Sequence, residues 1–150
     1  MTAAELLSFM RQHPLAVQSS VSSADAAQAA VVGIAVSDRF EVFFDTRDRS
    51  RKVDNLRRNP KIALVIGGAT VGDERSVQYE GVADEPSGAE LRRLKDLYFA
   101  SFPDGRARES WPGITYIRVT HVDPLQRLQS SATAGHRVRY RAARPRCGSG

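Results

Sequence analysis

Ser50, Arg51 and Lys52 are the residues whose types and spacing could do chemistry, because they open a short helix predicted over residues 50–58. A helix N-terminus carries a partial positive charge, so each cation there is unfavourable by roughly a few tenths of a kcal/mol. Residues 47–61 add to this repulsion with seven basic and two acidic side chains. A bound phosphate would resolve the conflict by accepting hydrogen bonds from the backbone, the hydroxyl and both cations. The alternative is a solvated basic surface with nothing bound.

Other chemistry-bearing side chains are scattered through the sequence without the spacing of a site. The lone cysteine, Cys147, and the three histidines share no metal-ligand spacing, so no metal site is predicted. No serine lies in a Gly-x-Ser-x-Gly turn and no acid–base pair stands out, so no catalytic side chain is predicted. His121 is interpreted as a surface or half-buried residue at the end of a strand. These observations favour chemistry carried by a bound cofactor.

The elements that must position the predicted phosphate site are mostly strands. Hydrophobic patterning predicts six strands, over residues 15–20, 28–36, 40–45, 62–66, 75–83 and 114–122. It also predicts three helices, over residues 2–13, 50–58 and 87–102. The strands follow one another through short turns, which is typical of a mainly β protein with an antiparallel barrel or sheet and peripheral helices. Residues 29–36 and 62–66 are so apolar that both faces of these two strands are expected to be buried.

Five features in order resemble the pyridoxamine 5′-phosphate oxidase-like family, whose members are flavin-binding split β-barrels. The quoted segments are Ala30–Val36, Phe43-Phe44-Asp45-Thr46 with Ser50-Arg51-Lys52, Asn55–Pro60 with Ile62–Val65, Tyr79-Glu80-Gly81, and Tyr98–Pro103. The resemblance covers about residues 5–120. It implies a six-stranded antiparallel split β-barrel that binds FMN.

The resemblance also implies which residues contact the cofactor. Arg51 and Lys52 would hold the FMN phosphate with help from Thr46 and Ser50. The strand backbone near Val31 and Val32 would contact the isoalloxazine ring. Two further positions match the family pattern with different side chains: Asp45, where relatives often have an aromatic residue, and Ser76, where the oxidase has a glutamine.

The resemblance predicts an FMN-dependent oxidoreductase that transfers a hydride between the flavin and a small-molecule substrate. Two alternatives stay open: a deazaflavin-dependent reductase, and a non-catalytic protein that carries flavin or haem. A homodimer with the cofactor at its interface is expected, because a partner would cover the strands predicted to be buried on both faces. Trp111 could cap a flavin from a partner subunit, but it is expected to pack against the last helix.

The charge distribution divides the chain into a predicted domain, residues 1–128, and a basic tail, residues 129–150. Residues 1–123 hold 16 basic and 17 acidic side chains, so the overall charge of +5 lies in the tail, which its composition predicts to be disordered. No specific nucleic-acid binding is expected from it, because Tyr140 is its one aromatic residue. The longest apolar run, Ala29–Val36, is too short to cross a membrane. With no signal peptide apparent and one cysteine, a cytoplasmic location is predicted.

Overall fold

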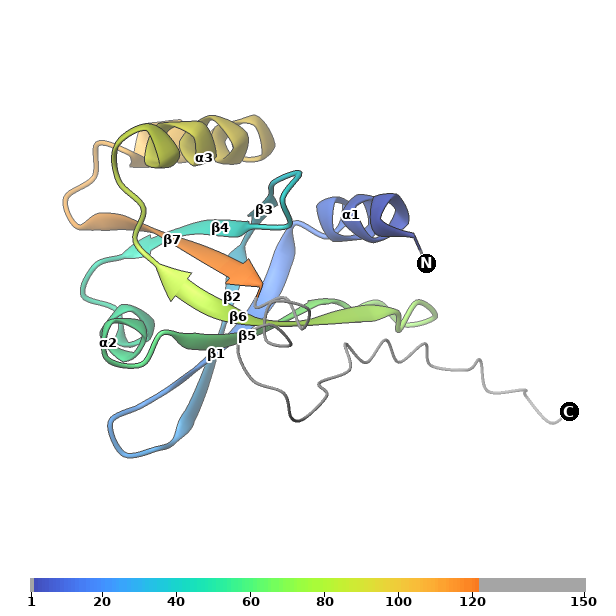
Figure 1. The fold of residues 1–150 in the computed structure, drawn as a ribbon, viewed down its shortest axis with the longest axis horizontal. Helices are drawn as coiled ribbons and strands as arrows, with labels where there is room; N and C mark the ends of the chain where they lie inside the picture. The colour runs from blue at the N-terminus through green and yellow to red at the C-terminus, as the bar shows by residue number, and fades with distance from the viewer. Residues whose placement is uncertain (1, 122–150) are drawn as a thin grey trace, which may run out of the picture.

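The computed structural model describes residues 2–121, which form one curled antiparallel sheet with helices packed around it (Figure 1). Its seven strands run in the order β2-β1-β5-β6-β7-β4-β3. The strands are β1 (Leu15–Val21), β2 (Ala27–Gly33), β3 (Ala35–Val36), β4 (Val42–Arg47), β5 (Lys61–Gly67), β6 (Ser76–Asp84) and β7 (Ile114–His121). The helices are α1 (Ala3–Gln12), α2 (Arg51–Arg58), α3 (Gly88–Ser101) and α4 (Gly105–Arg108). The predicted tail and the domain boundary before residue 129 lie outside the described residues.

The prediction of a mainly β, antiparallel protein with peripheral helices is confirmed, with one strand more than expected. The predicted strand over residues 28–36 is two strands, because the chain changes pairing partners at Ile34. Strand β2 pairs with β1, whereas β3 pairs with β4. Between them the Ile34 N–H donates to the carbonyl oxygen of Pro14, at 2.8 Å. An apolar run of this kind predicts extended chain but does not show where it leaves one partner for another.

Two apolar clusters hold these elements together. The larger one lies inside the curl of the sheet and includes Phe44, Leu64 and Ile66, all essentially fully buried. The smaller one lies between α3 and the outer face of β3, β4 and β7, around Phe43 and Tyr98. Figure 1 shows α3 lying across the β4–β7 side and α2 on another flank of the sheet. The β4 strand therefore faces the barrel interior on one side and the α3 layer on the other.

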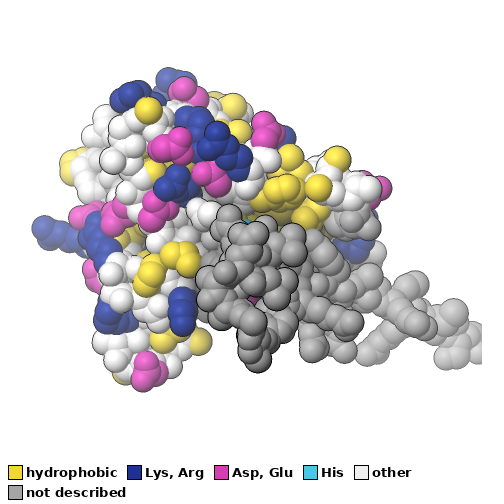
Figure 2. Space-filling model, in the orientation of Figure 1, with side chains coloured by type: hydrophobic (Ala, Val, Ile, Leu, Met, Phe, Trp, Pro, Cys, Tyr) yellow, Lys and Arg dark blue, Asp and Glu magenta, His cyan; other side chains and the backbone are white. Residues whose placement is uncertain are grey.

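Ion pairs fasten α3 to the sheet at the edge of the smaller cluster. Arg93 donates to Glu41, which is buried at the start of β4, and to Glu90 on its own helix. Arg118 on β7 pairs with Asp84 and Glu90. Figure 2 shows the resulting mixture of basic and acidic side chains near α3. Charge at this part of the surface is thus largely paired off, in contrast to the turn before α2.

The prediction that two strands are buried on both faces is wrong for the single chain. Strand β5 alternates between buried and exposed positions, and in β2 the side chain of Val31 is 65% exposed. Val17 on β1 is paired with both Val31 and Val65, so the three valines form a row across β2, β1 and β5. The sheet therefore presents an apolar outer face, which we call the valine row (Val31, Val17, Val65).

No helix among the described residues is both long and apolar enough to cross a membrane.

Strands β6 and β7 are paired in the sheet and approach closely at Gly81. A Cβ atom at Gly81 would lie 2.6 Å from the carbonyl oxygen of Thr120 and 2.8 Å from a methyl carbon of Val119. The absence of a side chain is what lets these two strands approach and continue the sheet into β7 and β4.

We expect Gly81→Ala to lower the free energy of unfolding by about 1–3 kcal/mol, because backbone atoms of β7 must shift to admit the new methyl group. Gly33→Ala is the matched control, since its Cβ would meet only the Phe102 ring, at 3.0 Å, and a side chain can turn aside. Urea unfolding of the two variants measures the difference. Equal losses would show that the β6–β7 approach is not the tight point of the sheet.

Candidate functional site

Three polar side chains meet where β4 passes into α2. Lys52, in the first turn of the helix, donates from its Nζ atom to Thr46 Oγ1 at 3.2 Å. The hydroxyl oxygens of Thr46 and Ser50 lie 3.4 Å apart. We call Thr46, Ser50 and Lys52 the clamp. The strand, the turn and the helix each contribute one member, so the β4–α2 connection itself builds the site.

The backbone at the start of α2 adds hydrogen-bond donors to the clamp. Ser50 occupies the N-cap position with extended backbone angles, and its carbonyl oxygen accepts from the N–H groups of Val53 and Asp54. The Ser50 hydroxyl makes no capping bond to the helix and faces Thr46 instead. Early N–H groups of the helix therefore keep their donor capacity, which suits an oxyanion.

Positive charge around the clamp is not compensated. Burial lowers the pKa of the Lys52 ammonium, because the charged form loses contact with water. Within residues 2–121, Arg51 and Lys52 form no ion pair, and the nearby Asp48 pairs with Arg57 at 2.5 Å. A dianionic phosphate would supply the missing negative charge and offset the cost of burying Lys52.

Asn55 holds α2 against the sheet. Its buried amide nitrogen donates to Ser20 Oγ on β1 at 3.1 Å and to Gln28 Oε1 on β2 at 2.9 Å. One turn later, Arg58 donates to the carbonyl oxygen of Val21 at 2.7 Å. These bonds fix the helix that carries the clamp to the strand that carries Val31. Sequence reasoning did not assign Asn55 this role, although a polar residue on the apolar side of an amphipathic helix is a usable signal.

The two valines predicted to contact the cofactor lie on β2, on opposite faces. Val32 is buried in the core, whereas Val31 is exposed in the valine row. Val31 follows Gln28 by three residues, which is about 10 Å along a strand. Val31 is thus linked to the clamp helix indirectly. Asn55 on that helix bonds to Gln28, and the backbone of β2 runs from Gln28 to Val31.

Asp45 is predicted at the site, but its side chain is on the other side of β4. Neighbouring residues of a strand point to opposite faces, so Thr46 faces the clamp while Asp45 faces the α3–α4 layer. There its two oxygens accept from Tyr98 Oη at 2.8 Å and from Arg108 Nε at 3.1 Å. Burial raises the pKa of the Tyr98 hydroxyl, which keeps it protonated as the donor. Asp45 therefore serves the packing of α3 and α4 in this chain.

Ser76 is also far from the clamp within one chain. It begins β6 and is paired with Gly67, whereas α2 meets β6 at Ala83, near the strand's other end. Seven residues of strand span roughly 23 Å.

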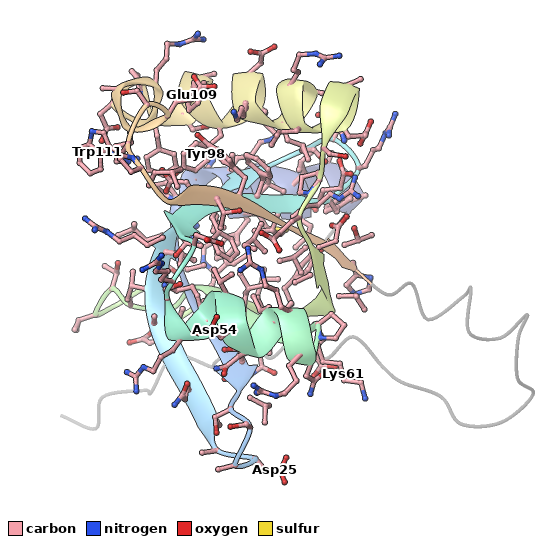
Figure 3. All side chains as sticks on the ribbon, turned by 90° about the vertical axis from the view of Figure 1, so that its left-hand side faces the viewer. Asp25, Asp54, Lys61, Tyr98, Glu109 and Trp111 are labelled. Carbon is pink, nitrogen blue, oxygen red and sulfur yellow. The ribbon has the colours of Figure 1, made fainter. Side chains whose placement is uncertain are left out.

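A cavity of about 290 Å³ lies between α2, β6 and β7, and its apolar lining residues include Val53 and Ile117. The sequence did not predict this cavity. Figure 3 shows α2 facing the viewer, with Asp54 on it.

Comparison with known proteins assigns the family. A model of the pyridoxamine 5′-phosphate oxidase family matches residues 2–139, so the chain belongs to this family. The resemblance seen in the sequence is thereby confirmed. The comparison with curated proteins found no match.

Solved structures share the fold at low sequence identity. A haem-binding protein from Mycobacterium smegmatis superposes with a TM-score of 0.68 at 16% identity, over 79% of this chain and 51% of that one. The haem storage protein HutZ from Vibrio cholerae gives 0.69 at 10% identity, over 80% and 89%. An FAD-binding protein from Mesorhizobium loti gives 0.64 at 14% identity, over 82% and 90%. This chain thus spans about half the length of the M. smegmatis protein, and the likeness to all three shows a common split-barrel fold.

We expect Asp45→Asn to lower the free energy of unfolding by about 1–3 kcal/mol, because Arg108 loses the more buried of its two carboxylate partners, Asp45 and Asp104. The control is Asp38→Asn, which removes an ion pair to Arg11 from a carboxylate that is 88% exposed and should cost at most about 0.5 kcal/mol. Chemical denaturation measures both. Equal effects would mean that Asp45 does not anchor the α3–α4 layer.

Proposed function

We propose that the protein binds FMN and acts as an oxidoreductase that transfers a hydride between the flavin and a small molecule. The observation that carries the proposal is the clamp, with two hydroxyls, a half-buried ammonium and free helix N–H groups around one point. Membership of the pyridoxamine 5′-phosphate oxidase family and the likeness to an FAD-binding protein support a flavin at such a site.

The residues present fit the phosphate of FMN. Thr46 and Ser50 offer hydroxyl donors, Lys52 offers a charge that burial has made costly, and Arg51 is exposed beside them and free to approach. The flavin, when bound, supplies the two-electron chemistry. This chain's part is to bind the phosphate, to orient the ring against the β2 backbone near Val31, and to hold positive charge close to the cofactor.

Two alternative ligands remain as candidates. The phosphate of a deazaflavin cofactor would bind the same clamp. Haem is favoured by a specific observation, since two similar structures are named as haem-binding and haem storage proteins. In this chain His121, at the end of β7, is half-buried and lies edge-on to Tyr79, with ring centroids 5.3 Å apart. The absorption spectrum of the purified protein separates a flavin, a deazaflavin and a haem.

We further propose that two copies pair through the valine row. The row crosses three strands and is exposed in the single chain, at 65%, 43% and 40% for Val31, Val17 and Val65. Exposed apolar surface of this kind is typical of protein interfaces. A two-fold pair would bring Val31 and a second clamp to one interface, where Ser76 of either copy could also approach a cofactor.

The cytoplasmic location predicted from the sequence also remains a proposal.

We expect Arg51→Ala combined with Lys52→Ala to weaken FMN binding by more than tenfold, because each charge-assisted contact contributes about 1.5–3 kcal/mol. Quenching of flavin fluorescence during titration of the apo-protein measures the affinity. Riboflavin is the control ligand, since it lacks the phosphate and should bind both proteins equally. Arg92→Ala on α3 is the control variant for loss of one exposed charge. Unchanged FMN affinity in the double variant contradicts the clamp.

We expect Val17→Asp to convert a dimer into monomers, because it places a carboxylate at the centre of the valine row. Val71→Asp is the matched control, since Val71 is fully exposed in the β5–β6 connection. Light scattering coupled to size-exclusion chromatography at micromolar concentration gives the mass. A monomeric wild-type protein with cofactor bound, or a dimer that survives Val17→Asp, would rule out this interface.

A further inference from the structure

An exposed tryptophan lies beside the cationic turn that leads into the clamp. Trp111 is the one tryptophan of the chain, and its side chain is 51% exposed in the loop between α4 and β7. Its packing against the last helix stays a prediction. Figure 3 shows Trp111 at the outer edge of the molecule, near Glu109. A large aromatic face open to solvent is a surface on which a planar ring can stack.

The loop that carries Trp111 is fixed to the turn before α2. The backbone N–H of Asp48 donates to the carbonyl oxygen of Gly113 at 2.7 Å, and Arg47 pairs with Ile114 in the β4–β7 ladder. The backbone N–H of Trp111 donates to the backbone carbonyl oxygen of Arg108 at 2.9 Å. Arg108 is itself tied to Asp45 on β4. Trp111 therefore stands in a braced loop, two residues before Gly113, which is hydrogen-bonded to Asp48 between Arg47 and Arg49.

The acidic residues of this edge are already paired with other cations. Asp48 is paired with Arg57, and Glu109 with Lys95 at 2.9 Å. Arg47 and Arg49 are exposed and, in the part of the chain that the structure describes, pair with no carboxylate. Guanidinium groups bind phosphate oxygens through paired N–H donors. The edge thus combines a free aromatic face with two free phosphate-binding groups.

We propose that Trp111, Arg47 and Arg49 form a binding site for an adenine nucleotide, separate from the clamp. The base stacks on the indole and the phosphates bind the two guanidinium groups. A planar ring joined to phosphates is the chemistry that this pairing of side chains recognises. A role for this site in docking a pyridine dinucleotide that exchanges hydride with the flavin rests on the proposed function. The binding of an adenine nucleotide at Trp111 does not rest on it.

The full chain titrated with ADP tests the proposal, with Trp111 as a built-in reporter. We expect ADP to quench the tryptophan fluorescence and inorganic pyrophosphate to leave it almost unchanged. By calorimetry, Trp111→Ala and Arg49→Ala should each weaken ADP binding tenfold or more. Trp111→Phe should stay within about threefold of wild type, because a phenyl ring still stacks. Arg92→Ala, which removes an exposed charge on α3, should change nothing.

Three results would overturn the proposal: no quenching by ADP, an affinity that survives Trp111→Ala, or an equal loss in Arg49→Ala and Arg92→Ala. ADP binding that depends on Lys52 but not on Arg49 would place the nucleotide in the clamp and overturn it as well. The proposed flavin function and the nucleotide site are tested by different outcomes. FMN binding without ADP binding removes only the nucleotide site, and ADP binding without FMN binding removes only the flavin proposal.

Discussion

The hydrogen bonds of the Asn55 amide are the interaction on which the candidate site depends. A helix of eight residues is marginal by itself, so tertiary contacts must hold it in place. Both hydrogens of the buried Asn55 amide are used, one on β1 and one on β2. This sets the distance and angle between the helix N-terminus and the apolar outer face of β2. The clamp is a site of fixed geometry because its helix cannot turn without leaving a buried amide unsatisfied.

The clamp is also a place where the chain gives up stability. Lys52 is partly buried in its charged form at the positive end of a helix, and burial lowers its pKa. Three exposed arginines, Arg47, Arg49 and Arg51, precede it in the chain, while Asp48 between them is paired with Arg57. Around Arg118 and Glu41, by contrast, the chain pairs its charges. Cations without an ion pair in the first turn of a helix are a local conflict that an anionic ligand relieves.

The sequence predicted most of what depends on local chemistry. The alternating strands indicated the sheet, which the structure confirms, and the cations of the first helical turn pointed to the start of α2, where a phosphate site stays a prediction. Three features depend on tertiary structure and were not predictable. The chain changes partners at Ile34 through a bond to Pro14. Asp45 matches a cofactor position in the family pattern, yet its side chain is held by Tyr98. Burial of both faces was inferred from composition, whereas the single chain buries one.

Strand β4 supports both the clamp and the tryptophan loop, because neighbouring residues of a pleated strand point to opposite faces. Thr46 faces the clamp, and Asp45, one residue earlier, faces the α3–α4 layer and holds Arg108. The backbone carbonyl oxygen of Arg108 in turn accepts from the backbone N–H of Trp111. The tryptophan loop is therefore braced, through Arg108, by the same strand that supports the clamp. A shift of β4 would move both together. The distance between the clamp and Trp111 is therefore set by one backbone segment and not by two independent loops.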